Sequence, residues 1–191
     1  MLIDFIISYY NRKTALDCLL YSLIAQTDKE WVAKVMIDDV EYNPETMVKD
    51  SRISYITMNK RYNDFGHTPR EIGKQESEAD YVILTNDDNY YTPNLVMEVK
   101  MAIAQHKRIK GVLPGIVYWD MVHSHFNYQY FRTAIGNGQI DMGAFATRTE
   151  LAKRVPLCSR FEADGIFIED FKRKFPQEHR VKIDKVLFVH N

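Results

Sequence analysis

The sequence predicts a single α/β domain in which a mostly parallel sheet is flanked by helices. Short apolar runs alternate with segments of helical hydrophobic spacing through residues 1–110, which is typical of strands joined by helical crossovers. The chain has 191 residues, 46% of them hydrophobic and 27% charged, which suits one well-buried globular domain. No internal repeat or linker divides it. We therefore expect one domain over residues 1–191.

Strands are predicted where short apolar runs end in polar residues. In the first half of the chain these runs lie at residues 3–8, 31–37, 52–58 and 81–85. In the second half they lie at residues 112–118, 141–146 and 186–189. The intervening stretch 119–138 is aromatic, polar and irregular, and predicts a loop.

Helices are predicted where leucine and other apolar residues recur at helical spacing. The first follows Thr14 and runs to about residue 26, and a polar loop within residues 59–80 leads into a short second helix. Thr92 and Pro93 predict the start of a third, since a hydroxyl cap and a proline suit a first turn. Further helices are expected at residues 149–155 and 165–174.

Composition excludes several function classes. The net charge of −1 gives no basic field for nucleic acid, so we expect no nucleic-acid partner. The two cysteines, Cys18 and Cys158, lie in unrelated contexts, which fits a reducing compartment and offers no thiolate metal site. No apolar run approaches the ~20 residues that span a bilayer. The sequence therefore predicts a cytoplasmic protein without an integral membrane segment.

Acidic pairs end two of the predicted strands. Asp38 and Asp39 follow the second strand, and Asp87 and Asp88 follow the fourth. Ligands of parallel α/β sheets bind at these carboxyl ends. One such pair could be a helix cap or a turn, but adjacent carboxylates repel, and two pairs favour a hard cation such as Mg²⁺ or Mn²⁺.

The first strand-to-helix turn, at residues 8–12, contains no glycine, and none occurs before Gly66. A dinucleotide fingerprint or a P-loop requires glycines at this turn so that the backbone can approach phosphate. The same absence counts against sugar-phosphate nucleotidylyltransferases, which share the architecture but need a glycine-rich first loop.

Several segments, in matching order and at compatible spacing, resemble the family 2 glycosyltransferases with the GT-A fold. They are the Tyr-Asn turn of residues 6–12, the first helix with its terminal Gln26-Thr27, the strand and Asp-Asp pair of 35–39, the Gly66, Arg70 and Gly73 element, and residues 81–88. The resemblance covers residues 3–95. It implies a nucleotide-sugar-binding half at about 1–95 and an acceptor and catalytic half at about 96–191. One departure is Asn86 at the first position of the metal-binding Asp-x-Asp-type motif.

This resemblance implies roles for the residues that match the motifs. The implied contacts are Tyr10 and Asp39 with the nucleobase, Ser8 and Arg70 with the nucleotide or its phosphates, Asp87 with the sugar or ribose, and Asp88 with Mn²⁺ or Mg²⁺. Two alternatives stay open at this point. Tyr10 could simply pack in the core, and Arg70 could be a solvated charge on a helix.

An inverting transferase also needs a carboxylate that takes the proton of the acceptor hydroxyl. The candidates are Asp164, Glu169 and Asp170, of which Asp164 is favoured because it has the character of an N-cap before a helix. Glu169 and Asp170 match the Glu-Asp sequence of the family but would lie within that helix. The third reading is that all three form a cap and a polar helix face.

The late histidine and three weaker residues complete the predicted site. His190 follows an apolar strand and lies 26 residues after Asp164, a spacing similar to that of the family's late metal-binding histidine. A metal or phosphate role follows for His190. Asp141, Trp119 and His125 are predicted acceptor contacts, of which Asp141 begins a segment that resembles the family's segment below the acceptor.

Together these features predict an inverting, metal-dependent glycosyltransferase of the hexosyltransferase type. It would move a sugar from a UDP- or GDP-linked donor to a glycan or other hydroxyl acceptor, in glycan or surface polysaccharide synthesis. A lipid-linked acceptor would require peripheral contact with a membrane. Two alternatives remain: a metal-dependent nucleotide-sugar phosphohydrolase, and a non-catalytic carbohydrate- or nucleotide-binding module.

Overall fold

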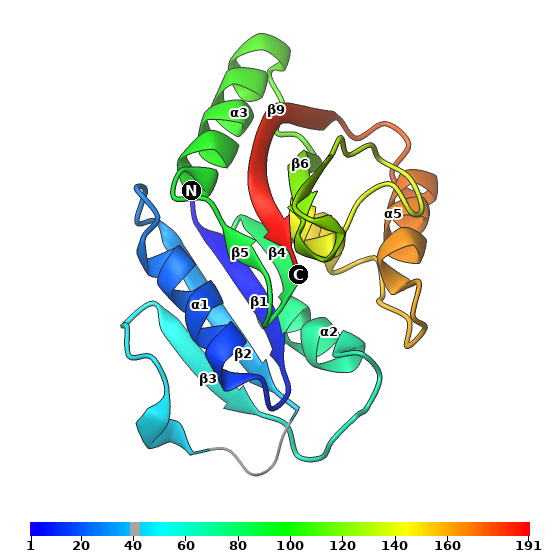
Figure 1. Ribbon diagram of the computed structural model, residues 1–191. Coiled ribbons are helices and arrows are strands. Elements are labelled where there is room, and N and C mark those ends of the chain that lie inside the picture. Colours follow the sequence, from blue (N-terminus) through cyan, green and yellow to red (C-terminus); the bar gives the residue numbers. More distant parts are fainter. Residues whose placement is uncertain (39–42) are drawn as a thin grey trace.

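The computed structural model, which describes residues 1–38 and 43–191, confirms a mixed α/β fold built on one curled sheet (Figure 1). Among the described residues the sheet runs in the order β3-β2-β1-β4-β8-β6-β9-β5, and β7 pairs with β6. The strands are β1 Ile3–Tyr9, β2 Trp31–Ile37, β3 Ile53–Thr57, β4 Tyr81–Asn86, β5 Tyr90–Tyr91, β6 Ile116–His123, β7 Gln129–Phe131, β8 Phe145–Arg148 and β9 Arg180–His190. The helices are α1 Lys13–Ile24, α2 His67–Glu76, α3 Leu95–Lys110, α4 Thr149–Ala152 and α5 Ala163–Lys174, with short 3₁₀ turns η1 Pro44–Thr46, η2 Ser124–Phe126 and η3 Met142–Ala144.

The first half of the chain forms the parallel part of the sheet. Strand β1 is buried along its whole length and pairs in parallel with β2 on one side and β4 on the other. Side chains of a strand alternate between the two faces. Phe5 therefore packs on Tyr91 of β5, with ring centroids 5.3 Å apart, while Ile6 faces α2. This arrangement places the carboxyl ends of β1, β2 and β4 at one edge.

Gln26 and Thr27 join the end of α1 to the start of α3. The buried amide of Gln26 donates to the carbonyl of Thr92 at 2.8 Å and accepts from the backbone N–H of Val96 at 3.1 Å. The backbone N–H of Thr27 donates to the carbonyl of Pro93 at 2.8 Å. Buried polar groups of this kind need partners. The Gln-Thr pair therefore connects the two helices by hydrogen bonds, and it lies away from the edge of the sheet where the ligand is predicted to bind.

Helix α3 starts later than the sequence predicted. Its N-cap is Asn94 without a side-chain cap, so the prediction of a hydroxyl cap at Thr92 is wrong. The carbonyl of Thr92 instead accepts from the N–H of Leu95 at 3.1 Å. The helix continues to Lys110 and closes at Gly111, whose φ of +76° suits glycine at a C-terminus. In the described residues no helix is long and apolar enough to cross a bilayer.

The second half adds antiparallel pairs. Strand β8 pairs antiparallel with both β4 and β6, and β9 runs parallel to β6 along most of its length. The stretch 119–138, predicted as an irregular loop, instead contains the end of β6, then η2 and β7. Pairing with β9, more than 60 residues away, extends β6 to His123, and local periodicity does not report such a partner.

Gly73 allows α2 to pack closely against the parallel strands. A Cβ at this position would lie 2.6 Å from Cγ2 of Ile6 and 2.9 Å from Sδ of Met36, both fully buried. We expect Gly73→Ala to lower the free energy of unfolding by about 1–2 kcal/mol, because overpacking outweighs the gain in helix propensity. Urea unfolding of both proteins measures this difference.

The matched control is Gly136→Ala. A Cβ there would meet only the side chain of Gln139, at 3.0 Å and beyond, and that flexible side chain can move aside. We expect this variant to unfold within about 0.5 kcal/mol of the parent protein. Equal stability of the Gly73 and Gly136 variants would contradict the close packing of α2.

Candidate active site

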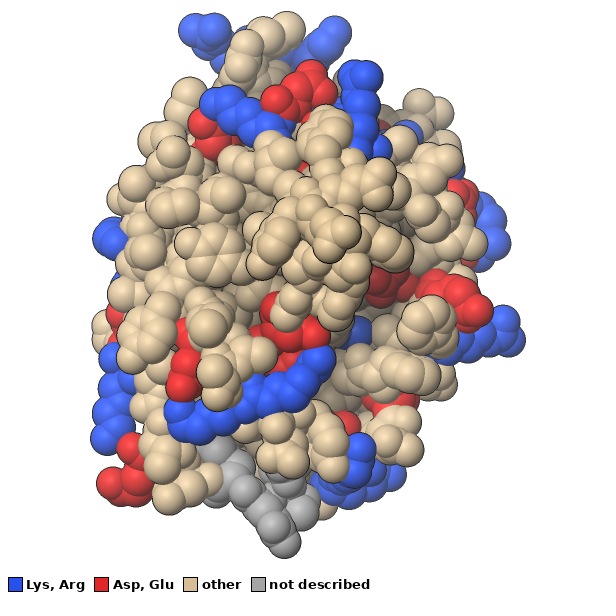
Figure 2. All heavy atoms as spheres, in the orientation of Figure 1, with Lys and Arg blue, Asp and Glu red and all other residues tan. Residues whose placement is uncertain are grey.

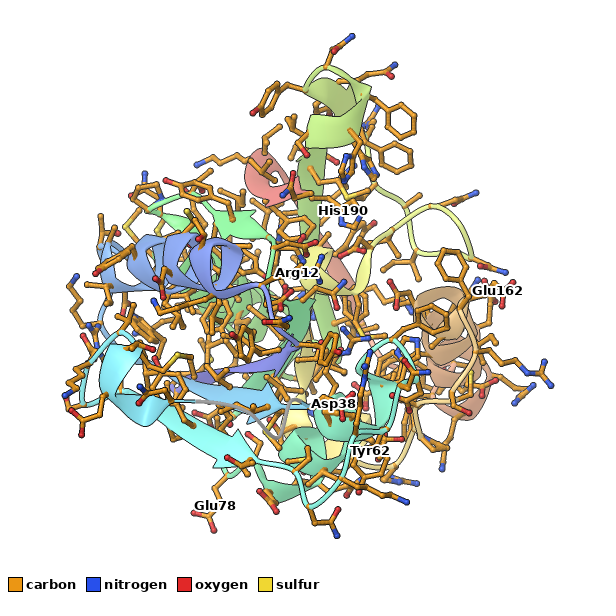
Figure 3. The ribbon with its side chains drawn as sticks, turned by 60° about the horizontal axis from the view of Figure 1, so that its bottom comes forward. Arg12, Asp38, Tyr62, Glu78, Glu162 and His190 are labelled. Atoms are coloured by element: carbon orange, nitrogen blue, oxygen red, sulfur yellow. The ribbon has the colours of Figure 1, made fainter. Side chains whose placement is uncertain are left out.

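Two cavities adjoin at the carboxyl ends of β1, β2 and β4. The first, about 560 Å³, is lined by the turn after β1, by Asp38, by residues 61–66 and by Asp87. The second, about 690 Å³, lies between that turn and the second half of the chain. Three residues line both: Arg12, Phe65 and Asn86. Figure 3 shows Arg12 and His190 close together, with Asp38 and Tyr62 to one side and Glu162 at the far edge.

Arg12 holds the acidic pair that ends β4. Its Nη2 lies 2.6 Å from Oδ1 of Asp87, and its Nη1 donates to Oδ2 of Asp88. The backbone N–H of Tyr10 donates to Oδ2 of Asp87 at 3.2 Å. Asp87 is fully buried, and this burial raises its pKa to about 6, against the opposing effect of Arg12. The sequence indicated no role for Arg12, although this residue lies in the turn of residues 8–12.

Arg70 lies inside the site and is only 2% exposed, so the alternative of a solvated helix charge is wrong. Its Nη1 donates to Oγ of Ser8 at 3.1 Å and to Asn86, and its Nη2 donates to the carbonyl of Phe65 at 3.1 Å. Burial lowers the pKa of Arg70, but a guanidinium remains charged at neutral pH. Arg70 therefore ties the turn after β1, the end of β4 and the loop before α2 together.

His67 is a site residue that the sequence did not indicate. Nη2 of Arg70 lies 2.7 Å from its Nδ1, and a guanidinium can only donate. Nδ1 must then accept, which places the proton of the neutral ring on Nε2. The pKa of His67 is lowered mainly by burial and next by the charge of Arg70, which favours the neutral ring. The ring lines the larger cavity and packs beside Phe65, with centroids 6.1 Å apart.

Tyr10 and Asp38 shape the smaller cavity. The guanidinium of Arg61 lies 3.6 Å above the ring of Tyr10, which is 39% exposed, so Tyr10 does not simply pack in the core. The carboxylate of Asp38 accepts from the backbone N–H groups of Tyr62 at 2.7 Å and Asn63 at 3.3 Å. Asp38 thereby positions the loop above the ring. Asp39, the predicted nucleobase contact, lies outside the described residues.

Asp164 and Asp141 meet on the opposite wall. Asp164 accepts from the backbone N–H of Met142 at 3.3 Å, and Asp141 accepts from that of Gly143 at 2.7 Å. The two carboxyl groups are close enough for the charge of Asp141 to act on Asp164. Burial, and then the neighbouring Asp141, raise the pKa of Asp164 to about 6; burial also raises the pKa of Asp141. Asp164 lies in the first turn of α5, so its prediction as the N-cap is wrong; Glu162 holds that position.

A model of the family described as Glycosyl transferase family 2 matches residues 4–163. The chain belongs to glycosyltransferase family 2. A protein of Haemophilus influenzae described as an uncharacterized glycosyltransferase is 23% identical over 127 residues, which are 66% of this chain and 42% of that protein.

Solved structures of S. aureus TarS share the fold of this family 2 chain. A crystal structure of its residues 1–349 matches with a TM-score of 0.78 and 14% identity, over 100% of this chain and 60% of that one. Its complex with UDP-GlcNAc matches with a TM-score of 0.78 and 16% identity, over 100% and 58%. The chain thus spans well under two thirds of the relatives it matches.

The other predicted bases lie outside the cavities of this family 2 chain. Glu169 forms an ion pair with Lys172 and accepts from the backbone N–H of Asn137 at 3.3 Å, and Asp170 forms an ion pair with Arg173. Neither is among the residues that line the two cavities. Of the three carboxylates, the structure brings only Asp164 into the site.

Of the three residues predicted as acceptor contacts, two line the larger cavity and one does not. Trp119 is fully buried within β6, so its prediction as an acceptor contact is wrong; its ring fills the core of the second half. His125 and Asp141 both line the larger cavity. Asp141 also lies 3.3 Å from Nδ1 of His190, so the late histidine reaches the same wall.

A divalent ion fits these residues only if oxygen atoms of the bound substrate complete the coordination shell of the ion. In the described part of the chain no group of three or more carboxylate, histidine or cysteine side chains is arranged to hold a metal. Oδ1 of Asp88 is buried without a hydrogen-bond partner, and His190 lines the same cavity. Mg²⁺ is commonly held by one or two carboxylates together with substrate phosphates. Asp88 and His190 suit such a partial site.

Asp164 is expected to weaken the fold at neutral pH. Its pKa of about 6 in the folded chain exceeds the ordinary 3.8, so its contribution to stability is present below about pH 4 and is lost as pH rises through 6. We expect Asp164→Asn to be more stable than the parent by about 1–2 kcal/mol at pH 7.

Denaturant unfolding of the parent and the Asn variant from pH 4 to pH 8 measures this effect. The difference between the two proteins should shrink as the pH falls through 6 toward 4, because the carboxyl of the folded parent becomes protonated; only below the ordinary pKa of 3.8 is it protonated in both states. A difference that does not change with pH would contradict the raised pKa of Asp164.

Proposed function

We propose that this family 2 chain transfers a hexose from a nucleoside-diphosphate sugar to an acceptor hydroxyl with inversion, in glycan or surface polysaccharide synthesis. The observation that carries the proposal is the joined pair of cavities. One end holds an exposed tyrosine beside the Arg12, Asp87 and Asp88 cluster, and the other end holds the carboxyl of Asp164. A donor extending from the first cavity into the second would place its sugar between these groups.

The smaller cavity suits the nucleotide. The face of Tyr10 and the guanidinium of Arg61 can pack against a base, and Arg12 brings positive charge to the region of the diphosphate. Ser8 lines this cavity, and its hydroxyl accepts from Arg70, which lines the larger one. A UDP-linked donor is the first candidate because TarS, which shares the fold, has been crystallised with UDP and with UDP-GlcNAc. A GDP-linked donor is the second.

The larger cavity suits proton removal from the acceptor. Asp164 is ionised above a pH of about 6 and can then accept the hydroxyl proton as the oxygen attacks the anomeric carbon from the side opposite the leaving group. A hydrogen bond from the backbone N–H of Met142 holds its carboxyl in place. The buried charge of Arg70 favours its ionised form. A divalent ion at Asp88 and His190 would neutralise charge on the departing diphosphate.

The pH profile of the reaction should report this carboxyl. We expect kcat/KM to fall on the acid side with an apparent pKa of about 6, because protonated Asp164 cannot accept a proton. Initial rates between pH 4.5 and 8 at low acceptor concentration measure the profile. Asp87 has a pKa in the same range, so Asp87→Asn is the control. Its kcat/KM should still fall on the acid side with the same apparent pKa. A flat profile would contradict Asp164 as the base.

Calorimetric titration with UDP and with GDP, each with and without Mn²⁺, tests the donor half of the proposal. Metal-dependent binding of one nucleotide supports it and names the base. Binding of neither to folded protein contradicts UDP- and GDP-linked donors and shifts support to a non-catalytic module. Consumption of a nucleotide sugar at a rate that no acceptor changes would instead support a phosphohydrolase.

A further inference from the structure

Two phenylalanines from distant segments stand side by side at the mouth of the larger cavity. Phe65 precedes α2 and is 64% exposed, and Phe161 precedes α5 and is 75% exposed. Their ring centroids lie 5.6 Å apart at an interplanar angle of 75°. Both rings line the cavity that holds Asp164. Leaving two large apolar rings in water costs free energy, so a pair at a cavity mouth indicates a binding surface.

Polar contacts hold Phe65 in this exposed position. Its φ of +60° is uncommon for a bulky side chain and persists only where neighbouring groups enforce it. The buried guanidinium of Arg70 does so by donating to the carbonyl of Phe65. The ring also packs on His67, itself held by Arg70. The exposed ring is therefore displayed by the same arginine that organises the donor site.

The groups around the two rings have the chemistry that binds sugars. Asn137, Glu162 and Asp164 line the same cavity, as does His125. A pyranose has apolar C–H faces that pack on aromatic rings and hydroxyls at its edge that donate to carboxylate and amide oxygens. A hydrocarbon chain could not hydrogen-bond to these carboxylates and would leave them desolvated.

The charges of the cavity oppose an anionic ligand on this side. Among its described lining residues the carboxylates are Asp88, Asp141, Glu162 and Asp164, and the guanidinium groups are Arg12 and Arg70. Arg12 stands at the boundary with the nucleotide cavity, where it is paired with Asp87 and Asp88, and Arg70 is buried. Figure 2 shows uncharged residues over the middle of this face, with acidic side chains below and to the right of them and a basic run directly beneath the central acidic group. A phosphate or carboxylate close to Glu162 and Asp164 would meet like charge.

We propose that the acceptor is an uncharged saccharide whose ring packs on the platform formed by Phe65 and Phe161, with the reacting hydroxyl beside Asp164. This inference rests on the proposed transfer function and names its acceptor class. Phe161 is the residue to test, because Phe65 also lines the nucleotide cavity while Phe161 lines only the larger one.

The experiment measures nucleoside diphosphate release from UDP-GlcNAc, UDP-glucose and UDP-galactose. The neutral acceptors are methyl β-glucoside, methyl β-galactoside, methyl N-acetyl-β-glucosaminide and the matching disaccharides. Methyl β-glucuronide, glucose 6-phosphate and farnesyl phosphate are the anionic acceptors. The variants are Phe161→Ala, Phe161→Leu and Phe161→Tyr, with Tyr21→Ala on α1 as a control that is 61% exposed and outside both cavities. Calorimetry of UDP binding accompanies each variant.

We expect turnover with a neutral saccharide and a rise of about tenfold in its KM in Phe161→Ala and Phe161→Leu, because only an aromatic face replaces the lost packing. Phe161→Tyr and Tyr21→Ala should stay within about twofold of the parent, with UDP affinity unchanged throughout. An unchanged KM in Phe161→Ala, or transfer only to anionic acceptors, overturns this inference.

The two proposals fail in distinguishable ways. UDP binding without transfer to any neutral saccharide overturns the acceptor inference and leaves the donor site standing. Absence of nucleotide binding in the folded parent, or donor hydrolysis that no acceptor changes, overturns the proposed function itself.

Discussion

Asp164→Asn is expected to lower kcat roughly a thousandfold while leaving the affinity for the donor nucleotide unchanged. The amide keeps the shape of the side chain and can still accept from the N–H of Met142, but it cannot take a proton. The nucleotide cavity is lined by other residues, so its geometry should persist. Steady-state rates with a productive acceptor, together with calorimetry of UDP or GDP, separate the two effects.

Glu169→Gln and Asp170→Asn are the matched controls for this prediction. Neither residue lines the two cavities; they form ion pairs with Lys172 and Arg173, and such partly exposed pairs contribute little. We expect kcat of each control to stay within about threefold of the parent. Normal activity of Asp164→Asn would remove Asp164 from the mechanism, and a large loss in Glu169→Gln would move the base there.

Asp88→Ala is expected to abolish metal-dependent turnover, a loss of at least about a hundredfold. Oδ1 of Asp88 is buried without a hydrogen-bond partner in the wall shared with His190, so its removal takes away the oxygen best placed to hold a divalent ion. The checking measurement is UDP or GDP binding over a range of Mn²⁺ concentrations. Binding should lose its dependence on Mn²⁺ in the variant.

Asp88 also pairs with Arg12, so the variant frees that arginine. Arg12→Met separates the two consequences, because it breaks the ion pair and keeps the carboxylate. We expect Arg12→Met to bind nucleotide more weakly yet to retain the response to Mn²⁺. If Asp88→Ala keeps that response, the metal site lies elsewhere. A lost response in Arg12→Met would instead show that the ion pair orients Asp88.

The sequence by itself was sufficient for the parallel half of the fold and for the edge at which the site lies. Strands end where an apolar run meets a polar residue, so Asp87 and Asp88 could be placed at the carboxyl end of β4 before any contact was known. These are local properties, since each depends on the period of a short segment or on the end of one element.

Contacts between distant residues could not be predicted from such patterns. Only the folded chain shows that Asp164 lines the cavity while Glu169 and Asp170 do not, because this depends on how α5 is rotated against η3. Pairing of β6 with β9 likewise buries Trp119, which the sequence had placed at the acceptor.

The partners of the two site arginines depend on the tertiary structure for the same reason. Arg12 reaches Asp87 and Asp88 across 75 residues of chain, and Arg70 connects Ser8, Asn86 and His67. The residue types that could do chemistry were visible in the sequence. Packing of separate elements decided which of these residues meet, which are desolvated and which therefore have a shifted pKa. The physical reason is that desolvation and charge pairing act over a few ångströms in space and not along the chain.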